Sequence, residues 1–87
     1  MNSLKVEDVL SSRGRVRILR ILTEIGELNI SEIARRARLN FGTTNRHLVV
    51  LEKEGIILHE KFGRVHIFRL NEKNHRARLI KKLINLW

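Results

Sequence analysis

The chain has 87 residues, enough for one small domain, and it carries 18 Lys and Arg against 9 acidic residues. Its net charge of +9 points to a polyanionic partner, either nucleic acid or an anionic membrane, unless it only reflects a solvated basic surface. The absence of cysteine excludes disulfides, zinc–thiolate sites and thiol chemistry, and no apolar run is long enough to span a bilayer. We therefore expect a soluble, cytoplasmic protein with no membrane partner, in which residues 1–87 form a single domain.

Two helices are predicted at the start of the chain. Residues 3–10 form a short helix capped by Ser3, and residues 12–27 form a second helix for which Gly26 is the expected stop. Apolar positions in the second helix cover so wide an arc that it needs contacts on several sides, as a central core helix does. The first helix has a narrower apolar face made of Val6, Val9 and Leu10.

Two further helices follow, separated by a very short turn. Asn29 begins the first of them, and Glu32 three residues later completes the logic of a capping box, with Asn in place of Ser or Thr. The second helix runs from Phe41 to Glu54 and is ended by Gly55. The spacing of these two helices is that of a helix-turn-helix motif.

A helical wheel divides the 41–54 helix into two faces. Thr44, Leu48 and Leu51 cluster on one side, which is expected to face the core. The opposite side carries polar side chains in its first turns, and this is the part of a helix-turn-helix reader that enters the major groove. The outward residues are Gly42, Asn45, Arg46, Val49 and Lys53.

The residue types on the outward face suit contacts with base pairs. Arg46 can pair bidentately with guanine, Asn45 can do so with adenine, and Gly42 permits close approach. Val49 either meets a thymine methyl group or is simply exposed. The alternative is a capped, solvated helix start, with Asn40 as an ordinary cap. The predicted DNA-binding residues are Asn40, Phe41, Gly42, Thr43, Asn45, Arg46, His47, Val49 and Lys53, with Lys61 and Arg64 from the segment that follows.

That following segment contains two β-rich runs, IILHE and VHIFRL, around a turn that includes Gly63. This pattern predicts a β-hairpin, and Lys61 and Arg64 at its tip are expected to meet the DNA backbone or minor groove. Taking Phe62 and Gly63 as the turn centre places His59 opposite His66. Two imidazoles are the beginning of a zinc or nickel site, but two ligands do not complete one. We therefore expect no metal and no other cofactor.

The last predicted helix covers residues 72–86 and has an apolar stripe at i+3/i+4 spacing. If residues 12–70 form the core, the two terminal helices keep apolar faces that a chain of this size has little left to cover. We expect a homodimer through these helices, and the alternative is that the last helix folds back on its own domain. The predicted dimerisation residues are Val6, Val9, Leu10, Leu79, Ile80, Leu83, Ile84 and Trp87.

Together these elements predict a mainly α fold with a small β-hairpin, which is a winged helix-turn-helix with extra N- and C-terminal helices. From Val9 to Leu70 the chain resembles the ArsR-type winged-helix transcriptional regulators. The most specific match is TTNRHLVVLEKEGI, which is similar to the family's Thr-x-Ser-x-His-Leu-x-x-Leu-x-x-x-Gly-Leu/Ile pattern, with Asn45 at the Ser position. The resemblance implies DNA binding as a dimer, with repression the usual outcome.

The chain also departs from the family pattern. The Cys-x-Cys pair of many family metal sensors is absent, and Arg38 stands where the inter-helix turn often has Gly. In a left-handed conformation Arg38 is strained by about 1 kcal/mol.

Other functions remain open from the sequence. The same fold can serve as a protein-interaction module, and the charge also suits non-specific nucleic-acid binding, although few aromatic residues are present for stacking single-stranded bases. No catalytic constellation is recognisable, so we do not expect an enzyme.

Overall fold

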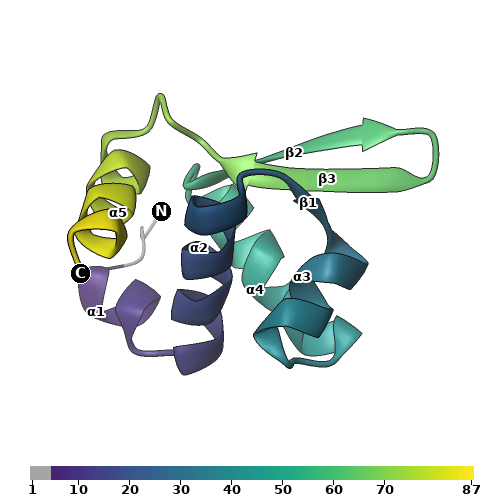
Figure 1. The fold of residues 1–87 in the computed structure, drawn as a ribbon, viewed down its shortest axis with the longest axis horizontal. Helices are drawn as coiled ribbons and strands as arrows, with labels where there is room; N and C mark the ends of the chain where they lie inside the picture. The colour runs from purple at the N-terminus through teal and green to yellow at the C-terminus, as the bar shows by residue number, and fades with distance from the viewer. Residues whose placement is uncertain (1–4) are drawn as a thin grey trace.

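Helix α2 (Arg13–Ile25) forms the centre of the fold. In this computed structural model, which describes residues 5–87, Ile18, Leu19 and Leu22 of α2 are almost completely buried. The helix contacts other helices and a strand on several sides (Figure 1), so the prediction of a central core helix is confirmed. The other core side chains are Val9, Ile21, Ile33, Ala37, Leu48, Leu51, Ile56, Ile57, Phe68, Leu70 and Ala77.

The other helices lie close to the predicted positions. They are α1 (Val6–Leu10), α3 (Ile30–Ala37), α4 (Phe41–Lys53) and α5 (His75–Leu86). The predicted cap Ser3 lies outside the described residues, and α1 begins after Lys5. Gly26 ends α2 as predicted, and Gly55 follows α4 with a positive φ of 74°, which suits a glycine after a helix.

Side chains of Ser and Asn mark the helix starts in this chain without proline. Each side-chain oxygen accepts a hydrogen bond from a backbone N–H in the first turn, which has no partner inside the helix. The caps are Ser12 on α2 (3.2 Å), Asn29 on α3 (2.9 Å), Asn40 on α4 (2.7 Å) and Asn74 on α5 (2.8 and 3.1 Å).

The predicted capping box of α3 is only half formed. Asn29 accepts from the backbone N–H of Glu32, but the Glu32 carboxylate binds the guanidinium of Arg35 at 2.7 Å instead of returning to Asn29. A guanidinium one turn further along offers two charged donors, which a single backbone N–H does not match.

Three strands form an antiparallel sheet in the order β1-β3-β2. The hairpin of β2 (Ile57–Phe62) and β3 (Val65–Leu70) is predicted by the sequence, whereas β1 (Leu28–Asn29) is not. A strand of two residues has no alternation to detect, and it forms because Leu28 pairs with Phe68 across the sheet. Through β1, the start of α3 is joined to the base of the hairpin.

The predicted turn of the hairpin is wrong by one residue. Phe62 pairs with Val65, so Gly63 and Arg64 form the turn, and His59 faces Phe68 instead of His66. Gly63 has a φ of 61°, whereas Arg64 is not among the described residues with positive φ. A two-residue hairpin loop with glycine at its first position is a type II′ turn, so the glycine fixes the first loop position.

The turn between α3 and α4 depends on a left-handed residue. Arg38 has φ 58° and ψ 44°, as its place in the inter-helix turn suggests, and its N–H bonds back to the end of α3. Arg17 of α2 donates from Nη1 to the carbonyl oxygen of Ala37 at 2.6 Å, which satisfies an acceptor at the end of α3. Ala37 itself is fully buried, so no larger side chain separates α3 from the core.

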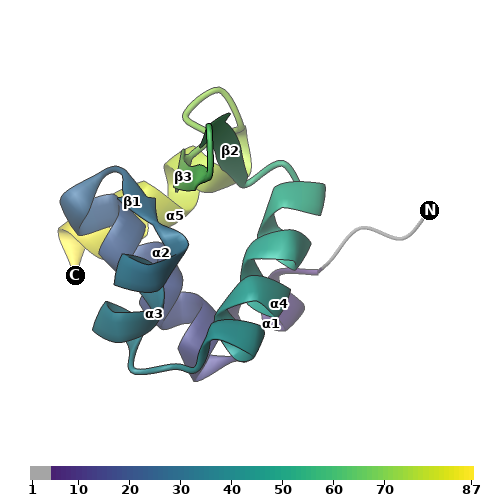
Figure 2. The ribbon, with the colours of Figure 1, turned by 90° about the vertical axis from the view of Figure 1, so that its right-hand side faces the viewer.

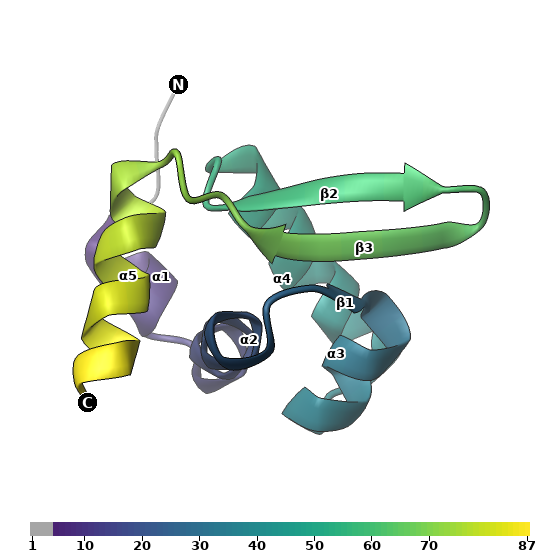
Figure 3. The same ribbon diagram turned by 45° about the horizontal axis from the view of Figure 1, so that its top comes forward.

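The two ends of the molecule differ in shape. The hairpin projects on one side, and α1 and α5 lie side by side at the opposite end (Figures 1 and 3). Viewed from the hairpin side, α4 and the hairpin lie in front and α5 lies behind (Figure 2). Within residues 5–87, no helix has both the length and the apolar character needed to cross a bilayer.

We predict that Arg38→Gly raises the free energy of unfolding by about 1 kcal/mol, because glycine adopts the left-handed conformation without steric strain. For a domain of this size, that gain corresponds to a melting temperature about 4–8 °C higher. Thermal unfolding followed by circular dichroism measures it. Arg36→Gly, the same exchange inside α3, is the matched control and lowers the melting temperature. A lower melting temperature for Arg38→Gly would contradict the strain argument.

Candidate nucleic-acid interface

Helix α4 presents one anchored face and one exposed face. Thr44, Leu48 and Leu51 are buried, and the Thr44 hydroxyl donates to the carbonyl oxygen of Asn40 at 2.8 Å. The exposed face runs the whole length of the helix, so its first turns are open to a partner. The exposed residues are Phe41, Gly42, Asn45, Arg46, Val49, Glu52 and Lys53.

The first turn of α4 is already ordered by internal hydrogen bonds. The Oδ1 atom of Asn40 accepts from the backbone N–H of Thr43, so this part of the Asn40 side chain acts as a helix cap. Arg46 donates from Nη2 to the Thr43 hydroxyl at 3.1 Å, which lays its guanidinium over the start of the helix. The guanidinium is exposed and still has other N–H donors for a ligand.

His47 differs from the other predicted contact residues because it is half-buried. Its Nδ1 atom accepts a hydrogen bond from Arg15 Nε at 3.3 Å. Burial, together with the neighbouring charges of Arg15 and Arg46, lowers the pKa of His47. The imidazole is therefore neutral at pH 7 and joins α4 to α2, which differs from the freely exposed helix-surface residue suggested by the sequence.

Two residues of α2 that support α4 are not identified from the sequence. Arg15 also donates to the carbonyl oxygen of Asp8 at 2.8 Å, so it ties α1, α2 and α4 together. Gly14 lies so close to α4 that a β-carbon there would be 3.2 Å from both His47 and Leu39. A glycine inside a helical pattern often marks such a close approach, and that was the available signal.

The hairpin tip supplies a second exposed basic group. Lys61 and Arg64 are exposed, as are the apolar side chains of Phe62 and Val65 beside them. Further from the tip, Arg69 forms an ion pair with Glu60, so this charge is already neutralised. The residues with free access to a polyanion are therefore at the turn.

At the base of the hairpin, His59 connects the hairpin to α4. Its ring stacks on Phe68 with a centroid distance of 4.5 Å, and its Nδ1 atom lies 3.5 Å from the carboxylate of Glu52. Its Nε2 atom lies 2.6 Å from Nδ1 of His66, so the two rings contact each other diagonally despite the shifted register. The two imidazoles thus bind each other, and no cluster of three or more possible metal-binding side chains was found in residues 5–87.

The charge distribution favours an anion at the α3–α4 region. From Ile33 to Leu51 the sequence contains no acidic residue, but it contains Arg35, Arg36, Arg38 and Arg46. Arg35 and Arg36 are paired with Glu32 just before this stretch. The exposed Arg38 and Arg46 lie at the turn and on the outward face of α4.

The predicted dimerisation residues separate into two groups. Val9 is 5% exposed and belongs to the core of its own chain, and Ile80 and Ile84 are partly buried against that core. The expectation that all of these faces stay open is therefore wrong for these three residues, because α1 and α5 both pack on the body of the fold. The exposed members are Val6, Leu10, Leu79, Leu83 and Trp87.

Comparisons with known proteins agree with this arrangement. Residues 12–58 match the family model described as bacterial regulatory protein, arsR family. A cadmium resistance transcriptional regulatory protein CadC homologue from Staphylococcus aureus is 30% identical over 82 residues, covering 94% of this chain and 67% of that protein.

Two solved structures have the same fold. The transcriptional repressor BigR from Xylella fastidiosa has a TM-score of 0.75 and 25% identity, with 92% of this chain and 80% of that chain covered. The homodimeric winged helix-turn-helix DNA-binding domain of Mb0332 from Mycobacterium bovis, described as a possible ArsR-family regulator, has a TM-score of 0.74 and 22% identity, with 93% and 72% covered.

We predict that the lowered pKa of His47 makes stability depend on pH. The folded-state pKa lies below the unfolded value of about 6.5, so the neutral imidazole stabilises the fold above that pH. This contribution is lost as the pH falls through the folded pKa. In His47→Gln the side chain does not titrate and still has an oxygen that can accept from Arg15. Urea unfolding at pH 7.5 and pH 5 should therefore show the wild type losing more stability on acidification than His47→Gln. An equal loss in both proteins would contradict the prediction.

Proposed function

This chain belongs to the arsR family of bacterial regulatory proteins, and on that premise we propose that it is a sequence-specific double-stranded DNA-binding repressor that acts as a homodimer. In this proposal α4 enters the major groove, and the hairpin tip contacts the backbone or the minor groove. The single observation that carries the proposal is the exposed face of α4, which has polar readers in its first turns and a buried apolar face behind them.

The chemistry of the α4 face supports base recognition over charge attraction alone. Asn45 is exposed on the same side as Arg46, and each of these side chains can make two hydrogen bonds to one base edge. Val49, 46% exposed one turn further along, offers an apolar contact for a thymine methyl group. Gly42 adds no side chain and lets the backbone approach.

The hairpin tip supports a different kind of contact. Lys61 and Arg64 sit on a narrow two-residue turn at the end of a projecting hairpin, where they can follow a phosphate backbone without reading bases. His59 anchors this hairpin on the end of α4 through Glu52 and Phe68. The two contact groups therefore belong to one firmly connected unit.

Homodimerisation and repression are proposed by analogy with the relatives and from the exposed apolar residues of α1 and α5. The Mb0332 domain is described as homodimeric, and BigR is described as a repressor. A two-fold dimer places its recognition helices about 34 Å apart and reads a near-palindromic site.

The direct test is selection of duplexes from a random pool at physiological salt, with single-stranded DNA and RNA as competitors. The proposal requires enrichment of a near-palindromic sequence. Binding without any sequence preference would leave a non-specific nucleic-acid-binding protein, and no binding to any nucleic acid would leave a protein-interaction module.

We predict a steep dependence of duplex binding on salt, because each neutralised phosphate releases counterions. With about 6–10 phosphate contacts per dimer, log K should fall with log salt at a slope of about −0.9 per contact. Fluorescence anisotropy of a labelled duplex between 50 and 200 mM salt measures the slope. Salt-independent affinity, or no binding at the lowest salt, would remove the support for a DNA-binding function.

We predict different effects for two exposed arginines. Arg46→Ala should weaken binding to the best site by about 1–3 kcal/mol and relax the preference at one base position. Arg64→Ala, the same exchange at the hairpin tip, should weaken all duplexes about equally. Repeating the selection with each variant separates the two. If Arg46→Ala leaves the preferred sequence unchanged, Arg46 contacts phosphate and does not read a base.

A further inference from the structure

A second exposed apolar surface lies at the end of the molecule opposite the hairpin. It is formed by α1 and α5, whereas the other exposed large apolar side chains lie mainly on α4 and the sheet strands. Trp87 is the most prominent member because its side chain belongs to a large aromatic residue and is 99% exposed. The members of this surface, called the terminal face below, are Val6, Leu10, Leu79, Leu83, Leu86 and Trp87.

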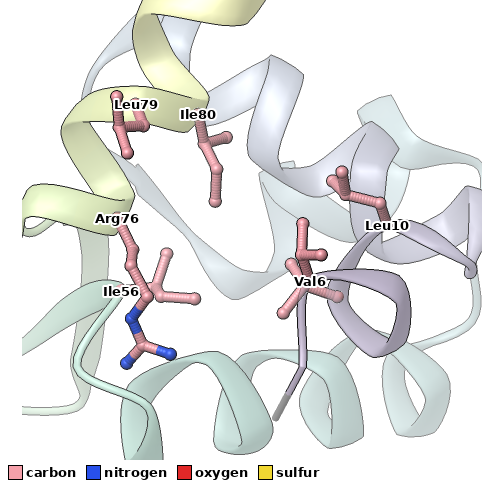
Figure 4. Close-up of a pocket in the computed structure, with 7 residues that line it drawn as sticks. Val6, Leu10, Ile56, Arg76, Leu79 and Ile80 are labelled. Carbon is pink, nitrogen blue, oxygen red and sulfur yellow. The ribbon is translucent and has the colours of Figure 1, made fainter.

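A pocket of about 240 Å³ opens within the terminal face, between α1 and α5 (Figure 4). Its wall is almost entirely apolar. Arg76 contributes the stem of its side chain, because its guanidinium is held at Glu54 by a 2.7 Å hydrogen bond to the carbonyl oxygen. The lining residues are Val6, Val9, Leu10, Ile56, Arg76, Leu79 and Ile80.

The spacing along α5 relates Trp87 to this pocket. Leu79, Leu83 and Trp87 are four residues apart and share one side of the helix. When two copies of this stripe are laid antiparallel across a two-fold axis at Leu83, Leu79 of each helix lies opposite Trp87 of the other. Antiparallel alignment also brings opposite helix dipole ends together. Leu79 is part of the pocket wall, so the partner's Trp87 reaches the pocket.

We propose that the homodimer forms with Trp87 of each protomer seated in the α1–α5 pocket of the other, in an antiparallel pairing of α5 centred on Leu83. This inference rests on the proposed homodimer and specifies its anchor and its register. It uses one contact twice, as a two-fold interface requires, with Trp87 facing Leu79 in both halves.

The area that Trp87 can bury makes it a suitable anchor. A Trp side chain buries about 150–250 Å², so two of them supply about 300–500 Å² of an interface of standard size, near 1,600 Å². Truncating a centrally buried Trp commonly has a large effect on affinity, and here the two-fold axis repeats that effect.

The charges around the terminal face are compatible with self-association. Each chain carries a net charge of +9, which opposes the approach of two copies. However, α1 contributes the exposed acidic residues Glu7 and Asp8, and α5 contributes the exposed bases Arg78 and Lys82. Facing α1 of one copy with α5 of the other brings opposite charges to the rim, and added salt screens the remaining repulsion.

The sequence itself provides the reporter for this proposal. Trp87 is the only Trp and there is no Tyr, so the intrinsic fluorescence of the intact chain reports on Trp87. As protein concentration rises, we expect the emission to shift to shorter wavelength and quenching by acrylamide to fall. The midpoint should coincide with the monomer–dimer transition measured by sedimentation without DNA. Emission and quenching that stay unchanged across that transition would overturn the anchor.

Matched variants test the contact from both sides. Trp87→Ala should raise the dimer dissociation constant about 100-fold or more, and Trp87→Phe should recover part of the loss. Val6→Ala at the pocket should weaken the dimer, while Val65→Ala, the same exchange at an exposed site in the hairpin, should not. Equal dimerisation by Trp87→Ala and the wild type would also overturn the anchor.

Single cysteines in this cysteine-free chain test the register. Leu83→Cys should form a disulfide-linked dimer under mild oxidation, because the two copies of residue 83 meet at the axis. Leu79→Cys should not, because its two copies lie about 12 Å apart along antiparallel helices, beyond the reach of a disulfide. Linking of both variants would indicate parallel helices, and linking of neither would place the axis elsewhere. Either result overturns the register.

These readouts are independent of DNA. If the dimer forms as described but no duplex is bound, the anchor stands and the proposed DNA-binding function fails. If duplex binding is specific and salt-dependent while Trp87 stays exposed in the dimer, the function stands and the anchor fails.

Discussion

The hydrogen bond from Arg17 to the carbonyl oxygen of Ala37 fixes the geometry on which the α4 face depends. Arg17 comes from α2, the most buried element, and it holds the last turn of α3. From there only the left-handed Arg38, Leu39 and the cap Asn40 separate the end of α3 from the start of α4. The direction of α4 is therefore set by the core, through a polar contact at a point where no large side chain intervenes.

The opposite end of α4 is held by the same chemistry. Arg76 of α5 donates to the carbonyl oxygen of Glu54, just after the helix, and Arg15 supports the helix from the side through His47. Several arginines of this basic chain thus satisfy the protein's own carbonyl groups. The net charge alone overstates how many cations face a polyanion, and the exposed bases at the turn, on α4 and at the hairpin tip matter more than the total.

Local chemistry explains which features could be predicted from the sequence. The positions of α2, α3 and α4 follow from apolar periodicity and from Asn and Gly at their ends, and these signals act within a few residues. The exposed face of α4 follows from the same periodicity. Features that depend on distant partners were missed or wrong: β1 needs Phe68, the half-buried state of His47 needs Arg15, and Val9 is buried only because α1 lies on the body of the fold. The hairpin register failed because the sequence did not show which position of the turn Gly63 would occupy.

The way in which helix ends are marked has a consequence for how quickly the fold forms. Asn and Ser caps and glycines occupy the positions where many domains place proline, and the chain contains no proline. No step of folding therefore waits for prolyl isomerisation, which takes about 10–100 s at 25 °C. Side-chain caps form and break with their own helix turns, on the submicrosecond scale of helix–coil relaxation. The slowest event left within one protomer is the closure of β1 onto β3, since this pairing joins segments far apart in the sequence.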